Sequence, residues 1–395
     1  MPSSTILHKT QRYEASRQGR YFIVRFKQDH QVLSTSDVNG GQTNALRYLV
    51  NFQSVEGNDH QSRCDEILSL SKQEYHQQLA DELRLDGAHM ASMDTAVNLN
   101  NLVHTQEIFR EITIDAFVSA GVKENALRAG DDTSWYQGAD GNEFINEPLI
   151  INTQDSNQDP VKKVGTINII LMLNRSLTSG AQAKVATIIT EAKSAALAEL
   201  AIPSKQSSHL ATGTGTDQYA IASPIESELM TLDCASGHLK LGELIGTAVT
   251  SAVTKAIGLQ NSLERSDTRN VLHALGRFGA TESMLLERLE HLLSEDSFAL
   301  LQKNQNAVFK DAKLVAAAYA YAAVLDRLEY QTLSPNIQND VLLDQAVNAA
   351  IAISGKSQQW QHFRDKLELK NNIQNYPIDL FIQAIAVGWL EKWSQ

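Results

Sequence analysis

The sequence is poor in cysteine, has no excess of basic charge and contains no long apolar run. Its two cysteines, Cys64 and Cys234, are too few for a disulfide framework and form no CxxC pair of the kind that binds zinc. A formal net charge of -12 argues against general nucleic-acid binding, which requires a basic surface. No apolar run approaches the length of a bilayer, so we expect no membrane span.

The N-terminal sequence, MPSSTILHKTQRYEASRQGR, lacks the apolar core of a secretory signal peptide. Together with the low cysteine content, this predicts a cytoplasmic location. Of the 395 residues, 43% are hydrophobic and 20% are charged, which is the balance of an ordinary globular protein. A chain of this length is long enough for about two domains.

The stretch from 165 to 217 organises the chain. Residues 167–173 form an apolar run rich in branched side chains, which indicates a buried strand. Strong helix formers follow over 181–200, and Pro203 ends them. A second strand is expected at 219–222. The order of strand, helix, glycine-rich turn and strand places polar groups at strand ends.

Polar residues interrupt the apolar pattern of the expected helix. Four of them share one face at spacings of three and four: Thr187, Thr190, Glu191 and Ser194. A carboxylate on an otherwise apolar helix is costly unless it is paired or used. We consider two interpretations of Glu191: it meets Asp217 across a strand end as part of a site, or it pairs with a lysine or caps a turn.

The sequence Ala-Thr-Gly-Thr-Gly-Thr-Asp occupies 211–217 and ends in the charge of Asp217. If this run is extended, its three threonines point one way and its glycines the other. Glycines on one side allow a ligand or backbone to approach closely. The alternative is a polar strand face without a ligand. Spacing alone favours that alternative and the structural interpretation of Glu191.

Two further positions are candidates for binding. The turn Asn39-Gly40-Gly41 precedes a stretch, 42–50, that we expect to be helical, and such a turn exposes N–H groups to an anion or oxyanion. The alternative is a plain connection. His238 stands just before an expected helix at 242–258, where it could orient a substrate or shuttle a proton; the alternative is a surface or capping residue.

The sequence predicts an α+β fold, with a mixed sheet and packed helices, followed by an all-α region. We expect residues 1–19 to be loose, 20–258 to form the α+β domain and 261–395 to form a helical domain of unknown role. A polar stretch over 135–159 predicts a loop or lid.

Four segments together resemble the adenosylcobinamide amidohydrolase family: GTIN at 165–168, TEAK at 190–193, ATGTGTD at 211–217 and GHLKLGELIG at 237–246. The resemblance extends over about 20–258, and TEAK with ATGTGTD at this separation is its most specific part. It implies hydrolysis of the amide that joins aminopropanol to a corrin-ring propionate. The products would be adenosylcobyric acid and aminopropanol. Departures are the insert at 135–159, Lys123-Glu124 before Asn125, and the helices after 261.

The resemblance and the residue pattern together give a predicted site. The catalytic candidates are Glu191, Asp217 and His238, with Glu191 the preferred base because burial on an apolar helix would raise the pKa of its carboxyl. Threonines 212, 214 and 216 would hold the oxyanion or the amide. The substrate-binding candidates are Asn39, Gly40, Gly41, Asn125, Thr166, Asn168, Lys193, Thr212, Gly213, Thr214, Thr216 and Lys240.

The chain contains no HExxH, no GxSxG and no paired His/Cys spacing, so we expect neither a metal nor a cofactor. The expected partner is a corrinoid small molecule, without nucleic acid; homo-oligomerisation stays open. Two other classes of function remain: a corrinoid or nucleotide binder without turnover, and a scaffold whose C-terminal helices carry a partner site.

Overall fold

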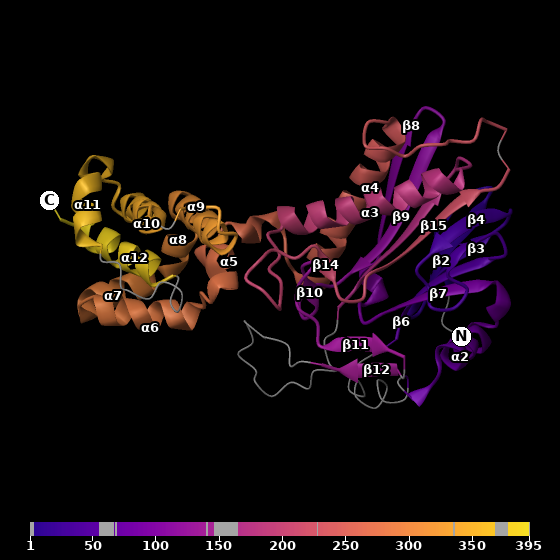
Figure 1. Ribbon diagram of the computed structural model, residues 1–395, viewed down its shortest axis with the longest axis horizontal. Coiled ribbons are helices and arrows are strands. Elements are labelled where there is room, and N and C mark those ends of the chain that lie inside the picture. The colour runs from indigo at the N-terminus through magenta and orange to yellow at the C-terminus, as the bar shows by residue number, and fades with distance from the viewer. Residues whose placement is uncertain are drawn as a thin grey trace. The chain divides into compact units, whose positions relative to one another are not determined.

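The computed structural model describes residues 4–54, 67, 69–139, 141–145, 165–226, 228–334, 336–367 and 378–394. The chain divides into two compact units, both visible in Figure 1. The first unit comprises Met1–Gly130, Asn157–Ile202 and Leu210–Glu264, and the second comprises Asp131–Ser156, Pro203–His209 and Arg265–Gln395.

Two β-sheets form the centre of the first unit. The five-stranded sheet has the order β1-β2-β3-β6-β7, with β1 (Ser4–Lys9), β2 (Tyr13–Gln18), β3 (Tyr21–Phe26), β6 (Tyr48–Gln53) and β7 (Met90–Thr95). The six-stranded sheet has the order β5-β4-β15-β13-β9-β8, with β5 (Gly41–Thr43), β4 (His30–Ser34), β15 (Gln218–Pro224), β13 (Ile167–Leu173), β9 (Ile112–Ala120) and β8 (Val103–Phe109). Within each sheet one pair is parallel, β6 with β7 and β13 with β15, and the other pairs are antiparallel.

Three apolar cores make the first unit a sandwich of four layers. Side chains such as Phe22 and Phe117 fill the space between the two sheets. Helix α2 (Lys72–Leu83) covers the other face of the five-stranded sheet. Helices α3 (Ser179–Glu199) and α4 (Lys240–Asn261) cover the other face of the six-stranded sheet (Figure 1). The order of layers is therefore helix, sheet, sheet, helices.

The central stretch folds as its pattern predicts. Strand β13 is buried along its whole length because it lies inside the six-stranded sheet with both faces covered. Helix α3 begins after Thr178, whose hydroxyl accepts a hydrogen bond from the N–H of Ala181. Helix α4 packs its Val249, Val253 and Ile257 into the core shared with α3 and the sheet.

Two predictions for the N-terminal part are wrong. The described residues of the segment 1–19 are not loose: β1 and β2 form one edge of the five-stranded sheet. Such strands contain many polar residues because one of their faces is solvated. The stretch 42–50 is not helical; its end belongs to β6, which pairs with β3 and β7 and is buried on both faces. Tertiary pairing overrides local helix propensity there.

The described helices of the second unit surround a separate apolar core. They are α5 (Val271–Leu275), α6 (Glu282–Leu292), α7 (Glu295–Lys303), α8 (Gln305–Phe309), α9 (Ala312–Glu329), α10 (Gln338–Ser354), α11 (Trp360–Lys366) and α12 (Asp379–Glu391). Arg277 binds both carboxylate oxygens of Asp326 and donates to the carbonyl of Ser208, which ties an earlier piece of the chain to these helices. Strands β11 (Trp135–Gly138) and β12 (Gly141–Phe144) form a hairpin; the rest of the expected lid lies outside the described residues.

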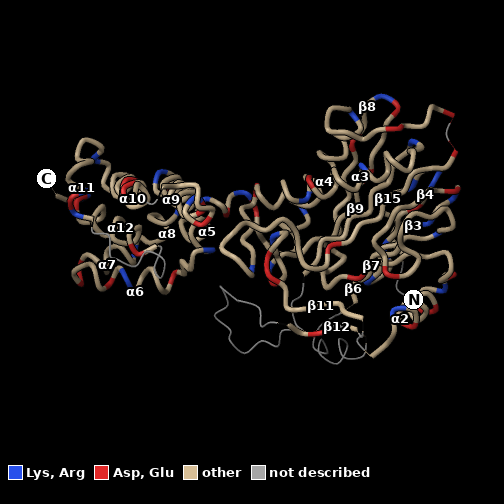
Figure 2. Tube along the Cα trace, viewed as in Figure 1, with Lys and Arg blue, Asp and Glu red and all other residues tan. Residues whose placement is uncertain are grey.

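Lysine and arginine are interspersed with aspartate and glutamate in both units (Figure 2). Among the described helices, none combines the length and the apolarity that a bilayer crossing requires.

The stability of the helical unit should fall in acid through Glu391. Hydrogen bonds from Lys366, then Ser394 and His362, lower the pKa of Glu391 to about 2. Although only 14% of its side chain is exposed, these hydrogen bonds outweigh burial, which acts in the opposite direction. The ionised carboxylate therefore stabilises the folded unit above its ordinary pKa of 4.5, and this contribution disappears as the pH falls from 4.5 to about 2.

The four tryptophans, 135, 360, 389 and 393, all belong to the second unit, so their fluorescence reports its unfolding. In urea titrations, Glu391→Gln should lower the midpoint of the fluorescence transition at pH 6 and change it progressively less towards pH 2. An equal effect of the substitution at both pH values would contradict this account.

Candidate functional site

A nearly buried ion pair joins helix α3 to the start of β15. Lys193 Nζ contacts the Asp217 carboxylate, and the two side chains are only 11% and 15% exposed. The carboxylate also accepts hydrogen bonds from the N–H of Ile167 at 3.0 Å and the N–H of Thr214 at 2.9 Å. Asp217 thus binds a lysine, a strand end and its own turn at once, so the TEAK and ATGTGTD segments meet through one carboxylate.

The 211–217 run is a turn rather than an extended row of threonines. Within it, only Gly213 and Thr214 are strand; they form β14, which pairs with β10 (Ala126–Leu127). Thr214 Oγ1 donates to Asp217. A Cβ on Gly213 would collide with the Asp217 carboxylate and lie 2.7 Å from Lys193 Nζ. Glycine at 213 is therefore required by the ion pair.

Asn125 and two threonines complete this corner of the first unit. Asn125 is buried, and its Nδ2 donates to the carbonyl of Gly165 at 2.9 Å and to Thr216 Oγ1 at 3.3 Å. Thr216 Oγ1 donates to the same carbonyl, and Thr166 Oγ1 donates to the carbonyl of Thr216. The hydroxyl hydrogens of these threonines and of Thr214 are thus used inside the protein, where they hold the turn.

A second polar cluster lies between the sheets at the same strand ends. Asn168 is fully buried, and its Nδ2 donates to Asn51 Oδ1 at 3.0 Å and to the carbonyl of Asp94 at 2.8 Å. Asn51 in turn donates to Ser119 Oγ at 2.9 Å. This network joins the two sheets and fixes the backbone position of Asp94 at the end of β7.

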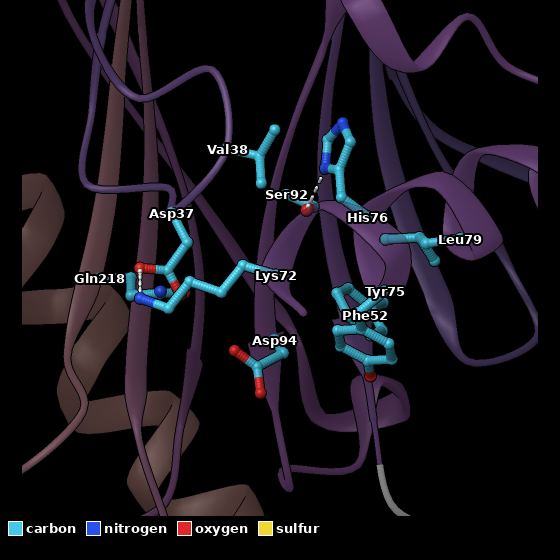
Figure 3. A pocket seen from close by; sticks show the side chains of 10 residues that line it. All are labelled: Asp37, Val38, Phe52, Lys72, Tyr75, His76, Leu79, Ser92, Asp94 and Gln218. Atoms are coloured by element: carbon cyan, nitrogen blue, oxygen red, sulfur yellow. Dashed lines mark hydrogen bonds and ion pairs between the residues drawn. The ribbon is translucent and has the colours of Figure 1, made fainter. Parts of the chain in front are cut away.

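A pocket opens beside that network, with an empty volume of about 390 Å³ counting its mouth. Figure 3 shows Asp94, Asp37 and Lys72 facing one space, with Phe52 and Tyr75 along one side of it. Gln218, the residue after Asp217, also lines the pocket, and its Oε1 is buried with no hydrogen-bond partner in the part of the chain that the structure describes. An unsatisfied buried acceptor at a pocket wall is suited to a ligand donor.

The pocket changes the acidity of Asp94. Its side chain keeps an exposed surface towards the opening, but the surrounding protein desolvates the carboxyl and raises its pKa above the ordinary 3.8; the Asp37 charge acts in the same direction. Lys72 Nζ pairs with Asp37 at 2.7 Å, and both side chains are largely exposed. Asp94 is thus a carboxyl with a raised pKa that faces open space.

The expected burial of Glu191 is wrong. Its side chain is exposed on α3, because the buried face of that helix carries Lys193 two positions further on. In the described structure no hydrogen bond or ion pair joins Glu191 to Asp217. The physical reason for choosing Glu191 as the base is therefore absent.

The structure also separates His238 and Lys240 from the ion pair. His238 is exposed, and Lys240 at the start of α4 pairs with Glu243 at 2.7 Å. Thr250 lies ten residues further along α4 and donates to the carbonyl of Ala192, beside Lys193. Ten residues of helix span about 15 Å, so Lys240 and His238 do not share the Lys193 corner.

The turn at Asn39, Gly40 and Gly41 is a connection between β4 and β5, with no helix after it. Asn39 Nδ2 donates to the carbonyls of Gly87 and Met90 at 2.9 and 2.8 Å, so the side chain fastens the loop to β7. Thr212 is the remaining threonine candidate. Its Oγ1 accepts a hydrogen bond from the N–H of Ala129 at 2.8 Å.

One cluster in the first unit has the composition of a metal site. His8, His104 and Asp115 each place one nitrogen or oxygen within 4.8 Å of the others. No local spacing in the sequence relates the three residues, because β1, β8 and β9 supply one each.

Together, the sandwich and its polar end define a class of protein, a four-layer α+β protein with an acid-lined pocket at the strand ends. A sequence profile of the adenosylcobinamide amidohydrolase family matches residues 4–265. An uncharacterized protein of Methanocaldococcus jannaschii, MJ1613, is 35% identical over 192 residues, which are 48% of this chain and 71% of the relative. The chain belongs to the adenosylcobinamide amidohydrolase family.

Two solved structures have a remote likeness. The PH0078 protein of Pyrococcus horikoshii OT3 has a TM-score of 0.28 and 10% identity, covering 64% of this chain and 82% of that one. The L-aminopeptidase D-Ala-esterase/amidase of Ochrobactrum anthropi, described as a variant of the Ntn hydrolase fold, has a TM-score of 0.29 and 11% identity, covering 69% and 91%. Likenesses this remote carry no information about the site of this chain.

Proposed function

We propose that this protein hydrolyses the amide between aminopropanol and a corrin-ring propionate in adenosylcobinamide. Water adds its oxygen to the amide carbonyl carbon, the carbon–nitrogen bond breaks and the amine leaves with a proton. The products are adenosylcobyric acid and aminopropanol. Family membership supports the hydrolase class, and the specific substrate is our proposal.

The observation that carries the proposal is the convergence of three of the four family segments, GTIN, TEAK and ATGTGTD, at one end of the first unit. GTIN supplies Thr166 and Asn168, TEAK supplies Lys193 and ATGTGTD supplies Asp217. Asn168 bonds the backbone of Asp94, whose side chain lines the pocket. Residues that are distant in the sequence thus meet at one end of the unit, and one of them, Asn168, holds the backbone of Asp94 at the opening.

The pocket is suited to the small end of the substrate. A corrin macrocycle is much larger than the pocket, so the ring would lie outside while the amide and the aminopropanol enter. Gln218 Oε1, which lacks a partner among the described residues, would accept a hydrogen bond from the amide N–H or the alcohol of the aminopropanol.

Within this proposal Asp94 is the catalytic residue. Its carboxylate would take a proton from the attacking water and then give it to the leaving nitrogen, which is general base and general acid catalysis by one group. A raised pKa favours the first step, because it makes the carboxylate a stronger base towards the attacking water. The buried Lys193–Asp217 pair would act as a positioning element, since it holds the turn that leads into Gln218.

The proposal is tested by incubating the full chain with adenosylcobinamide and separating the products by chromatography. We expect release of aminopropanol in proportion to enzyme and time. Tight binding of the corrinoid without release would favour the alternative, a corrinoid-binding protein without turnover. If the protein neither binds the corrinoid nor releases aminopropanol, both the hydrolase and the binding protein are rejected.

The second unit should be dispensable for turnover. A fragment of residues 1–264 keeps all of the first unit's described core, including the α4 side chains buried against α3 and the sheet. A cut at 258 would be too early, because Gln260 and Asn261 bond to residues of the first unit, including the N–H of Val122.

We expect the 1–264 fragment to be folded by circular dichroism and to retain kcat within about tenfold of the full chain. Its melting temperature should fall, because segment 203–209 loses its bonds to Arg277 and Glu329. A well-folded but inactive fragment would mean that the helical unit supplies part of the site.

A further inference from the structure

We propose that His8, His104 and Asp115 bind a divalent transition-metal ion such as Zn²⁺, at a site separate from the pocket. The three residues come from β1, β8 and β9, so they join the edge of one sheet to the edge of the other. The pocket is lined instead by residues of α2, β6, β7, the start of β15 and the loop after β4.

The spacing of the ligand atoms suits one ion. His104 Nε2 lies 2.8 Å and His8 Nε2 lies 3.6 Å from Asp115 Oδ1. Ligands about 2.1 Å from a metal are separated by about 3.0 Å along an octahedral edge and about 3.4 Å along a tetrahedral edge. The two observed distances bracket these values, and all three ligand atoms lie within 4.8 Å of one another, so side-chain movements would place them around one ion.

An unsatisfied nitrogen points to a ligand at this place. His8 Nε2 is buried and has no hydrogen-bond partner among the described residues, although it faces the Asp115 carboxylate. A buried imidazole nitrogen without a partner is unfavourable, and coordination would satisfy it. On binding, the metal displaces the proton that His104 Nε2 shares with Asp115, and that proton leaves to solvent.

The surroundings hold the ligands in place, as metal sites require. Tyr13 donates its hydroxyl to Asp115 Oδ2 at 2.7 Å, and Gln106 donates to Asp115 Oδ1 at 2.9 Å. The His104 ring stacks on Phe117 with centroids 4.4 Å apart. His8 and His104 keep 22% and 25% of their side chains exposed, which leaves a path for the ion and room for water.

Two histidines and one carboxylate form the three-ligand set of open zinc and non-haem iron sites. Since β1 is the first strand of the chain and an edge of its sheet, the ion would fasten it to the opposite sheet. The inference does not depend on the proposed hydrolysis of a corrinoid.

The test is a titration of the metal-stripped full chain with Co²⁺, whose visible absorption reports its coordination. We expect one equivalent to bind with histidine and oxygen ligands. His104→Ala and Asp115→Asn should each weaken binding by at least about 100-fold, and Tyr13→Phe, which removes only the supporting hydroxyl, by about 10–100-fold. The matched control is His291→Ala, an exposed histidine of the second unit, which should leave the titration unchanged.

A melting-temperature increase of roughly 5–10 °C at a metal concentration a hundredfold above Kd should accompany binding and be lost in His8→Ala. If a ligand variant fails to fold, X-ray absorption of the Zn²⁺-loaded wild-type chain remains decisive. Imidazole scattering from two histidines would support the site. Sulfur ligands, no stoichiometric binding, or binding unchanged in folded variants of His8 and His104 would each overturn the inference.

Discussion

Replacing Asp94 with asparagine should lower kcat for adenosylcobinamide by about 10²–10⁴-fold, the range that general acid–base groups contribute. Asparagine keeps the shape of the side chain but cannot accept a proton from water. Asn168 bonds the backbone carbonyl of Asp94, and the substitution does not change that carbonyl. The fold and the corrinoid affinity should therefore stay close to wild type.

The pKa of Asp94 also predicts how kcat/KM changes with pH. Desolvation by the surrounding protein raises the pKa of the Asp94 carboxyl, although its side chain keeps an exposed surface, so the base is ionised only above that raised value. The rate kcat/KM should therefore fall on the acid side at a pH above the ordinary aspartate pKa of 3.8, and this limb should be absent from the residual activity of Asp94→Asn.

Asp81→Asn is the matched control, since Asp81 is an exposed aspartate on α2, and it should retain wild-type turnover. With Glu191 as the preferred base, the sequence alone predicts that Glu191→Gln abolishes turnover. With Glu191 exposed, we now expect little change. Loss of activity in Glu191→Gln together with an active Asp94→Asn would move the chemistry to the α3 side of the sheet.

Breaking the Lys193–Asp217 pair should cost the chain about 3–5 kcal/mol of unfolding free energy, because one charge remains nearly buried without its partner. Asp217→Asn keeps acceptors for the N–H of Ile167 but leaves the Lys193 ammonium uncompensated. The quantity to measure is the free energy of urea unfolding followed by far-UV circular dichroism.

A double-mutant cycle separates the Lys193–Asp217 interaction energy from the effects of each substitution on its other contacts. Adding Lys193→Met to Asp217→Asn should recover stability, with a coupling energy of about 1–3 kcal/mol. The surface pair Lys9–Glu14 is the control, and Lys9→Met should change stability by less than about 1 kcal/mol. Simple additivity of Lys193→Met and Asp217→Asn would contradict a direct interaction.

The sequence predicts the central elements of the fold because their signals are local. An uninterrupted apolar run marked β13, and strong helix formers marked α3 and α4. The same local reasoning failed for 42–50, where strand pairing decides the structure, and for β1 and β2, whose solvated face resembles a loop.

The site was predicted only in part, for a physical reason. Segments TEAK and ATGTGTD do meet, but through Lys193 and Asp217. The predicted meeting of Glu191 with Asp217 is wrong, because the helix turns Glu191 away. The pocket could not be found from spacing, because Asp37, Asp94 and Gln218 approach one another only when the two sheets pack. A single aspartate at a strand end has no sequence signature.

The most direct measurement is hydrolysis of adenosylcobinamide by the full chain in water enriched in ¹⁸O, with both products analysed by mass spectrometry. We predict one aminopropanol and one adenosylcobyric acid per turnover, with one ¹⁸O atom in the new carboxyl group, and loss of this activity in Asp94→Asn. Corrinoid recovered unchanged after prolonged incubation with folded protein would contradict the proposed function. Undiminished hydrolysis by Asp94→Asn would place the reaction elsewhere than in the pocket.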